Sequence, residues 1–212
     1  MSMPATEIVQ ADEPDIDHFV FLHDLSWNDY KQLLRMRGDH SAPRISYLEG
    51  EVEIMSPSRT HEGIKSLIGR LVEAYCLERG IRFQPLGGWT LKDRRSRRGA
   101  EPDECYIIGD HDADRPHIAI EVVWTSGRID KLDIYRKLGV AEVWYWRKGR
   151  LSLYRLHGDR YAPITASHVL PELDLELLAR FLDQPTAYDA IVAYREALRG
   201  ADQTADRNQS GD

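Results

Sequence analysis

The chain has 212 residues, of which 42% are hydrophobic and 30% are charged, a balance that excludes a disordered chain, collagen and a coiled coil. Because 28 Lys and Arg face 35 Asp and Glu, the net charge is −7, so any contact with nucleic acid must be local. Two cysteines, Cys76 and Cys105, exclude a disulfide scaffold, and no run reaches the roughly 18 apolar residues of a membrane span. We therefore expect a cytoplasmic protein with reduced thiols and no membrane segment.

The predicted elements alternate between strands and helices. Residues 1–17 are acidic and aperiodic, so we expect a flexible N-terminus, and the polar residues 200–212 are expected to form a disordered tail. Apolar residues at helical spacing predict helices over 26–37, 58–79, 128–138, 173–182 and 186–198. Strand patterns predict a hairpin over 44–56 and further strands over 81–85, 89–91, 103–108, 117–124, 142–146, 151–156 and 160–165. This order predicts an α/β (α+β) fold, a mixed β-sheet flanked by helices in a single domain over 18–199.

Two carboxylates fall opposite each other in the predicted strand pair of 103–108 and 117–124. Asp103 begins the first strand and Glu121 lies inside the second, and an antiparallel connection centred on residue 112 places them face to face. Directly opposed Cβ atoms are about 4.5–5.5 Å apart, so the two charges repel. Either one carboxylate stays protonated or a hard cation such as Mg²⁺ binds between them. The alternatives are a salt bridge for Glu121 and ordinary turn chemistry for Asp103, which follows a proline.

A lysine lies in the apolar stripe of the predicted helix 128–138. Lys131 shares a face with Ile134, Tyr135 and Leu138, which should pack against the sheet. Such a lysine either meets a carboxylate or carries its amine along its stem to the helix edge, and both interpretations stay open. Two carboxylates that hold Mg²⁺ and a lysine that assists the attacking water would fit a phosphodiester hydrolase. Tyr135 is expected to pack this helix rather than to react.

Two residues at the start of the predicted helix 58–79 are weaker candidates. His61 lies near the edge of the apolar stripe, where it either positions a water beside the site or simply begins the helix. Glu62 points away from that stripe, so the helical phase argues against a catalytic role for it.

A basic loop precedes Asp103 closely and is the candidate contact with DNA. Either it holds the phosphate backbone beside the metal, or it is a solvated loop that balances an acidic surface. Nothing in the sequence indicates base-specific readout. The cations of this loop are Lys92, Arg94, Arg95, Arg97 and Arg98.

Four segments resemble the Uma-two family of restriction endonucleases, a branch of the PD-(D/E)XK nuclease superfamily. They are ISYLEGEVEIMSPSRTHEGI, EPDECYII, HIAIEVVW and KLDIYRKLGVAEVWYW, and together they span roughly residues 44–147. The resemblance rests on an ordered set of a Gly-Glu hairpin, Ser-Pro, His, Pro-Asp, Glu-Val, Lys-Leu-x-x-Tyr and Gly-Val-x-Glu-x-Trp. It implies a restriction-endonuclease-like sheet flanked by helices, with Asp103 and Glu121 as ligands of Mg²⁺ or Mn²⁺. It also favours a role for His61.

The chain departs from the family pattern in two places. The superfamily lysine should follow the glutamate by two residues, where this chain has Val123, but the family places a lysine on the next helix, which matches Lys131. In place of Ser-Pro and a longer loop the chain has the shorter run 124–127. The resemblance implies a Mg²⁺-dependent endonuclease that hydrolyses phosphodiester bonds in DNA. The departures leave open a catalytically inactive nuclease fold that binds nucleic acid or protein, and a homodimer is expected only by analogy.

Overall fold

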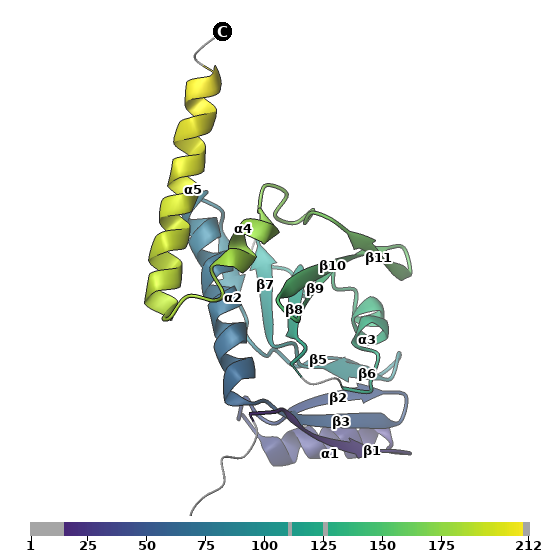
Figure 1. The fold of residues 1–212 in the computed structure, drawn as a ribbon. Coiled ribbons are helices and arrows are strands. Elements are labelled where there is room, and N and C mark those ends of the chain that lie inside the picture. Colours follow the sequence, from purple (N-terminus) through teal and green to yellow (C-terminus); the bar gives the residue numbers. More distant parts are fainter. Residues whose placement is uncertain (1–14, 110–111, 125–126, 210–212) are drawn as a thin grey trace, which may run out of the picture.

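Two β-sheets and five helices make up the part of the chain that the structure describes, residues 15–109, 112–124 and 127–209 of a computed structural model (Figure 1). In chain order the elements are β1 (His18–Leu22), α1 (Trp27–Arg37), β2 (Arg44–Leu48), β3 (Glu51–Ser56), α2 (Arg59–Glu78), β4 (Phe83–Pro85), β5 (Leu91–Asp93), β6 (Arg98–Ala100), β7 (Glu104–Ile108), β8 (Ile118–Val122), α3 (Lys131–Leu138), β9 (Glu142–Arg147), β10 (Arg150–His157), β11 (Arg160–Ile164), α4 (Leu175–Arg180) and α5 (Ala187–Gln209).

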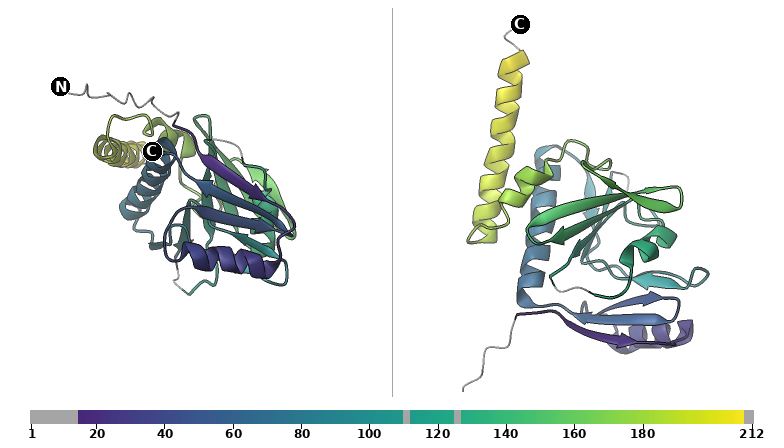
Figure 2. Two further views of the ribbon diagram at one scale, coloured as in Figure 1. Left: turned by 90° about the horizontal axis from the view of Figure 1, so that it is seen from below. Right: turned by 45° about the vertical axis from the view of Figure 1, so that its right-hand side comes forward.

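The first sheet is antiparallel, with strand order β1-β3-β2-β6-β5. Strand alternation in β2 and β3 places Ile45, Tyr47 and Val52 on one face, where they pack with Tyr30 and Leu34 of α1. The capping box of Ser26 begins α1, as the sequence predicts. Since α1 covers this apolar face (Figure 2), the other face of the sheet is left for the polar residues of the hairpin.

The second sheet is mixed, with strand order β11-β10-β9-β8-β7-β4. Its one parallel pair, β8 and β9, is connected through α3, and its other pairs are antiparallel. The prediction of a mixed sheet flanked by helices is confirmed, although the strands divide between two sheets. Residues 101–103 carry the chain from β6 in the first sheet to β7 in the second, which places Asp103 where the sheets meet.

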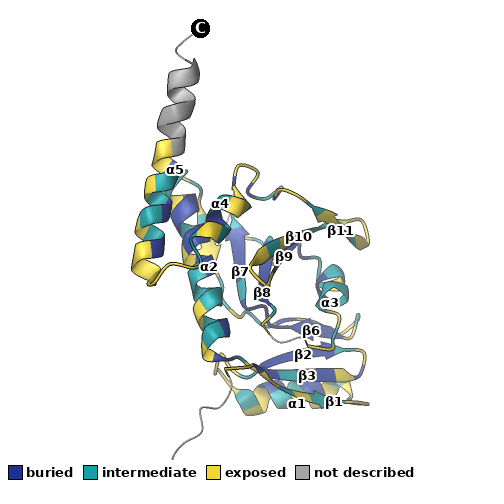
Figure 3. Ribbon diagram, viewed as in Figure 1, coloured by how far each residue is buried: buried dark blue, intermediate teal, exposed yellow. Residues whose placement is uncertain are grey.

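The two faces of the second sheet belong to different hydrophobic cores. Ile118, Ile120 and Trp144 face the larger core, which α2, α4 and α5 complete, whereas Ala119 and Val143 face α3. Figure 3 shows the buried residues concentrated along the strands and on the side of α2 that meets this sheet. Each fully buried large side chain contributes roughly 1.5–3 kcal/mol. Because side chains alternate along β8, Glu121 lies on the α3 face.

Four features of the secondary structure differ from the sequence predictions. The strand β1 was not predicted, and the basic segment after residue 91 forms the hairpin of β5 and β6 rather than a loop. The helix α3 begins at Lys131 because Asp130 caps it. The helix α5 continues to Gln209 through the residues expected to form a tail, a stretch without proline that sustains helical backbone.

Cys76 and Cys105 are both free and buried. Within the described ranges, no helix has the length and apolar character that crossing a membrane requires.

Candidate active site

The two predicted carboxylates lie opposite each other at the junction of the sheets. The pairs Glu104 with Ile120 and Cys105 with Ala119 have the register that the sequence predicts, so Asp103, directly before β7, faces Glu121. Both carboxylates are buried, with 1% and 2% of the residue exposed. Their charges are therefore balanced inside the protein rather than by solvent.

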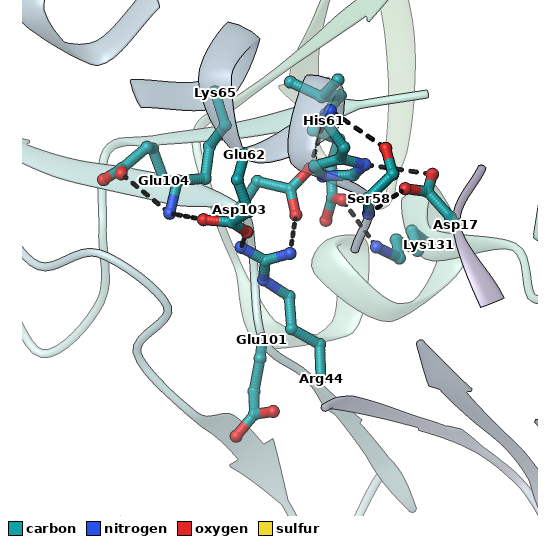
Figure 4. A network of polar contacts seen from close by, with 12 residues as sticks. Asp17, Arg44, Ser58, His61, Glu62, Lys65, Glu101, Asp103, Glu104 and Lys131 are labelled. Carbon is teal, nitrogen blue, oxygen red and sulfur yellow. Dashed lines mark hydrogen bonds and ion pairs between the residues drawn. The ribbon is translucent and has the colours of Figure 1, made fainter. Parts of the chain in front are cut away.

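Asp103 is held by one backbone donor and two cationic side chains. The backbone N–H of Val122 donates to its Oδ2 at 2.6 Å, and His61 Nε2 lies 3.0 Å from the same oxygen. Arg44 Nη1 lies 3.0 Å from Oδ1 as an ion pair. Arg44 comes from the polar face of β2, so both sheets contribute to the position of Asp103 (Figure 4).

Glu121 is held from α3. Lys131 Nζ donates to its Oε2 at 2.6 Å, and the Tyr135 hydroxyl donates to its Oε1. Lys131 occupies the first helical turn, and its side chain is 15% exposed, so the amine turns inward to the carboxylate rather than outward along its stem. Tyr135 was expected to pack the helix rather than to react; it packs there and also donates to Glu121, because the helical spacing of four residues places its hydroxyl beside the lysine.

His61 is buried between two carboxylates. Its Nδ1 lies 3.1 Å from Asp17 Oδ2, and its Nε2 faces Asp103. Asp17 also accepts the backbone N–H of Ser58, the N-cap of α2, at 2.9 Å. Of the N-terminus expected to be flexible, residues 1–14 lie outside the described residues, whereas Asp17 is 4% exposed and belongs to the site. His61 thus does more than begin a helix.

Glu62 contacts the site indirectly, through Arg44. It is half-buried, and its carboxylate lies 2.7 Å from Arg44 Nη2 and 2.9 Å from Lys65 Nζ. Lys65 also lies 3.6 Å from Glu104. Glu104, Lys65, Glu62 and Arg44 thus alternate in charge along a chain of ion pairs, and Glu62 holds Nη2 of Arg44 while Asp103 faces Nη1, as Figure 4 shows. The helical phase that directed Glu62 away from the apolar stripe agrees with this placement.

The loop before α3 is fixed by a carboxylate of the first sheet. Glu53 Oε2 accepts the backbone N–H groups of Arg128 and Ile129 at 2.7 and 3.3 Å, and Glu53 is 3% exposed. Gly127 packs on the same carboxylate, since a Cβ there would lie 2.5 Å from Oε2. These contacts determine where α3 begins and, through it, where Lys131 lies.

The environments push the pKa values of the two facing carboxylates apart. Burial opposes ionisation of Asp103, but Arg44, His61 and Lys131 outweigh it and lower the pKa. Burial dominates at Glu121 and, with the charge of Asp103, raises its pKa despite Lys131 and Tyr135. Burial also opposes the charge on His61, yet Asp103 and Asp17 raise its pKa to about 9. The arrangement separates the roles of two adjacent acids.

A cavity of about 280 Å³ lies between the two sheets beside these groups, although Asp103 itself is not among the residues that line it. Glu121, His61 and Lys131 line it, and so does Val123, the position at which the resemblance would place the superfamily's lysine. Glu121 pairs in register with Tyr145, and Tyr145 with Ser152, so one polar residue per strand lies in a row across β8, β9 and β10. The amine of Lys131 therefore reaches the cavity that a lysine at position 123 would also line.

The basic hairpin divides into exposed and buried cations. Arg94, Arg95 and Arg97 are exposed on the β5–β6 connection. Arg98 instead points inward from β6, with its side chain 10% exposed, and lies 2.6 Å from Asp133 of α3 and 3.1 Å from Glu49. The prediction of Arg98 as a DNA contact does not fit this geometry, because strand alternation turns its guanidinium onto α3.

Sequence reasoning missed several residues that hold the site in place. Asp17 precedes the short strand HFVFL, whose alternation could have placed it on an inner face, but no local motif marks it. Arg44 and Glu53 occupy polar positions in a hairpin whose apolar alternation was recognised, so they were detectable as its opposite face. Tyr135 was seen but assigned to packing.

The donor set fits a divalent cation that keeps part of its hydration shell. Asp103 Oδ1 is buried and accepts no hydrogen bond from the described residues, Arg44 being an ion-pair neighbour only. No cluster of three or more His, Cys, Asp or Glu side chains suited to a metal occurs within 15–109, 112–124 and 127–209. Two adjacent carboxylates suffice for Mg²⁺, which commonly binds one or two of them together with water and substrate phosphate.

Comparison with models of protein families gives a match. The model of the Uma2 family, described as "Putative restriction endonuclease", matches residues 27–183. A search of curated proteins finds no match to the chain. The matched range includes Asp103, Glu121, Lys131 and His61 but begins after Asp17.

Proposed function

Because the chain belongs to the Uma2 family of restriction endonucleases, we propose that it is a divalent-metal-dependent nuclease that hydrolyses phosphodiester bonds in DNA. The observation that carries the proposal is the contact of Lys131 Nζ with Glu121 Oε2 at 2.6 Å, beside a facing Asp103 and an open cavity. Lys131 comes from a helix, Glu121 from a strand and Asp103 from the residue directly before a second strand, so the tertiary structure brings the three side chains together.

The carboxylates of Asp103 and Glu121 would hold Mg²⁺ or Mn²⁺. When bound, the ion supplies Lewis-acid stabilisation of the negative charge on the phosphoryl group. Lys131 is a second source of positive charge at the cavity, and its ammonium stabilises the charge that develops on the phosphate oxygens or orients the attacking water. The Tyr135 hydroxyl holds the other Glu121 oxygen and so fixes the direction of that carboxylate.

His61 acts through Asp103. With Asp17 on one ring nitrogen and Asp103 on the other, the imidazole has no freedom to turn, and it fixes the carboxylate that faces Glu121. Arg94, Arg95 and Arg97 are the proposed contacts with the phosphate backbone, and Arg147, exposed where β9 meets the cavity, is a further one. A homodimer stays a prediction that analytical ultracentrifugation would test.

A catalytically inactive nuclease fold is the second candidate, and one observation favours it. Among the described residues, Asp103 is contacted by Val122, His61 and Arg44, and both oxygens of Glu121 are hydrogen-bonded by Lys131 and Tyr135. In such a protein the internal cations would take the place of the metal permanently, and the domain would bind nucleic acid or protein without cleaving it.

Plasmid nicking with Mg²⁺ or Mn²⁺ tests the proposal. We expect the wild type to nick supercoiled DNA and Glu121→Gln to lose activity by at least about 100-fold, because the variant lacks the charged carboxylate that would hold the metal ion. Lys131→Ala should lose about 100-fold or more, whereas Lys137→Ala, an exposed lysine on the same helix, is the matched control and should keep full activity. Full activity of Lys131→Ala would remove the lysine from the mechanism.

Relocating the lysine gives a sharper version of the same test. Val123 lines the cavity and follows Glu121 by two residues on β8. In the variant Val123→Lys with Lys131→Ala, we expect activity to recover at least about tenfold over Lys131→Ala alone, because the amine reaches the same cavity. Absence of nicking in every variant, together with no metal-induced rise in the melting temperature of the wild type, would favour the inactive fold.

A further inference from the structure

The cavity at Glu121 and Lys131 has aromatic walls on both sides. Phe19 of β1 and Met55 of β3 are partners in register and lie side by side on the wall made by the first sheet. Tyr145 of β9 and Tyr154 of β10 lie on the opposite wall, with ring centroids 5.9 Å apart at an interplanar angle of 81°. A flat apolar group that enters between the sheets would therefore find aromatic surface on either side.

The carboxylates that line the cavity are already engaged inside the protein. Asp17 is bonded to His61 and Ser58, Glu53 holds the backbone before α3, and Asp130 caps that helix. The Lys and Arg residues of the lining are Lys131 at its floor and Arg147 at the end of β9, where the side chain is exposed. The walls thus suit an uncharged ring, and positive charge is available at the floor and at the rim.

The depth of the site determines what must enter. Glu121 is 2% exposed and the Lys131 side chain 15%, so a phosphate can meet them only inside the cavity. A phosphate within a strand brings a neighbouring nucleoside with it. A duplex can present a phosphate while its bases stay stacked, but a base that follows the phosphate between the aromatic walls would have to leave the stack and its pairing partner. A volume of about 280 Å³ lies just below the range of roughly 300–1,000 Å³ that is usual for ligand pockets, which leaves room for one nucleotide but not for a base pair.

We propose that this cavity binds one unpaired nucleotide, with its base against Tyr154 and Tyr145, and that the substrate is therefore a single-stranded segment of DNA. The inference rests on the proposed function, because it assigns the substrate class of the same site. Stacking on aromatic rings is tolerant of sequence, since every base has a π-face. The proposal therefore predicts a preference for unpaired DNA without a strong preference among bases.

Binding measured without cleavage tests the inference separately from activity. The probe is a short fluorescein-labelled oligothymidylate, compared by fluorescence anisotropy with a labelled hairpin duplex, both in EDTA so that no divalent ion is present. We expect the single strand to bind more tightly. Tyr154→Leu should weaken its binding by about 5- to 150-fold, the range for loss of one stacked base. Tyr188→Leu, the same change at a 75% exposed tyrosine of α5, is the matched control.

The salt dependence tests the rim cation. Arg147→Ala should reduce the slope of log affinity against log salt by about 0.7 for the single strand. Arg180→Ala, an exposed arginine on α4 beyond the opposite face of the second sheet, should leave the slope unchanged.

Equal affinity for duplex and single strand, or binding by Tyr154→Leu equal to that of Tyr188→Leu, would overturn the inference even if plasmid nicking succeeds. A tyrosine-dependent preference for the single strand in a protein that cleaves nothing with Mg²⁺ or Mn²⁺ would support the nucleotide site and overturn the proposed nuclease activity. The two failures are thus distinguishable.

Discussion

The placement of Lys131 depends on a contact that the sequence does not mark, between Glu53 of β3 and the backbone before α3. Glu53 Oε2 accepts two N–H groups there, and Gly127 leaves the space that the carboxylate fills. We expect Glu53→Gln and Gly127→Ala both to loosen this connection. Glu53→Gln removes the charge and keeps the shape, whereas Gly127→Ala adds a Cβ that would lie 2.5 and 2.7 Å from the two carboxylate oxygens.

The magnitudes follow from the bonds that each change affects. A hydrogen bond to a charged group contributes about 1.5–3 kcal/mol and a neutral one about 0.5–1.5 kcal/mol, so Glu53→Gln should lower the free energy of unfolding by about 1–3 kcal/mol. Gly127→Ala displaces the carboxylate from both donors and should cost about 3–5 kcal/mol. Since both changes act on the same contact, the double variant should cost little more than Gly127→Ala alone, which leaves a coupling energy of about 1–3 kcal/mol.

Urea unfolding monitored by the fluorescence of the five tryptophans measures these effects. The matched control is Gly63→Ala in α2, where a Cβ meets nothing within 4 Å and the change should stabilise by about 0.5–1 kcal/mol. Each loosening variant should also reduce nicking by about 10- to 100-fold, because a shift of about 1 Å at Lys131 is costly for catalysis. Additive costs in the double variant would refute the idea that one carboxylate positions the loop.

Three further predictions concern other contacts. Asp17→Asn should lower kcat about 10- to 100-fold with little change in KM, because the amide has no negative charge and only one acceptor oxygen for the N–H groups of both His61 and Ser58, and an unchanged kcat in nicking assays would contradict this role. Arg98→Ala should lower the melting temperature without changing the salt dependence of DNA binding, whereas Arg94→Ala should reduce that slope by about 0.9 for duplex DNA; the reverse result would return Arg98 to the DNA contacts. Arg199 and Arg195 of α5 lower the pKa of Glu78 from 4.5 to about 2. The stability that their contacts with Glu78 contribute is therefore present above pH 4.5 and is lost as the pH falls towards 2. The melting-temperature difference between wild type and Glu78→Gln should shrink over that window, and a constant difference would show that the pair does not stabilise the folded state.

The parts of the site that local pattern specifies could be predicted. The centre of the turn fixes the register of a hairpin. A turn centred on residue 112 therefore predicted, from the residue numbers alone, that Asp103 and Glu121 face each other. Helical phase likewise placed Lys131 on the face that meets the sheet, because the apolar stripe of α3 has only one direction in which to be buried. These predictions needed no knowledge of which strands share a sheet.

The supporting residues could not be predicted because they depend on how the two sheets meet. Asp17 reaches His61 only because β1 adds to the edge of β3, and Arg44 reaches Asp103 only because the chain crosses between the sheets at residues 101–103. The burial of Arg98 has the same origin, since its partner Asp133 is 35 residues away on α3. A count of cations in a segment cannot reveal which of them the tertiary structure neutralises.

In the proposed mechanism, whether the lysine lies on a strand or on a helix determines which part of the fold has to be rigid. A lysine at position 123 would be positioned by the hydrogen bonds between β8 and β9, so no additional side chain would be needed to hold its backbone in place. The amine of Lys131 depends instead on where α3 begins, and that is determined by the Asp130 cap and by Glu53 through Arg128 and Ile129. Under the proposed function, the site would thus depend on a lysine, a cap and a remote carboxylate that act together, and not on a single residue of a rigid strand. We therefore expect substitutions before α3 to affect activity more than equally conservative substitutions along β8 away from Glu121.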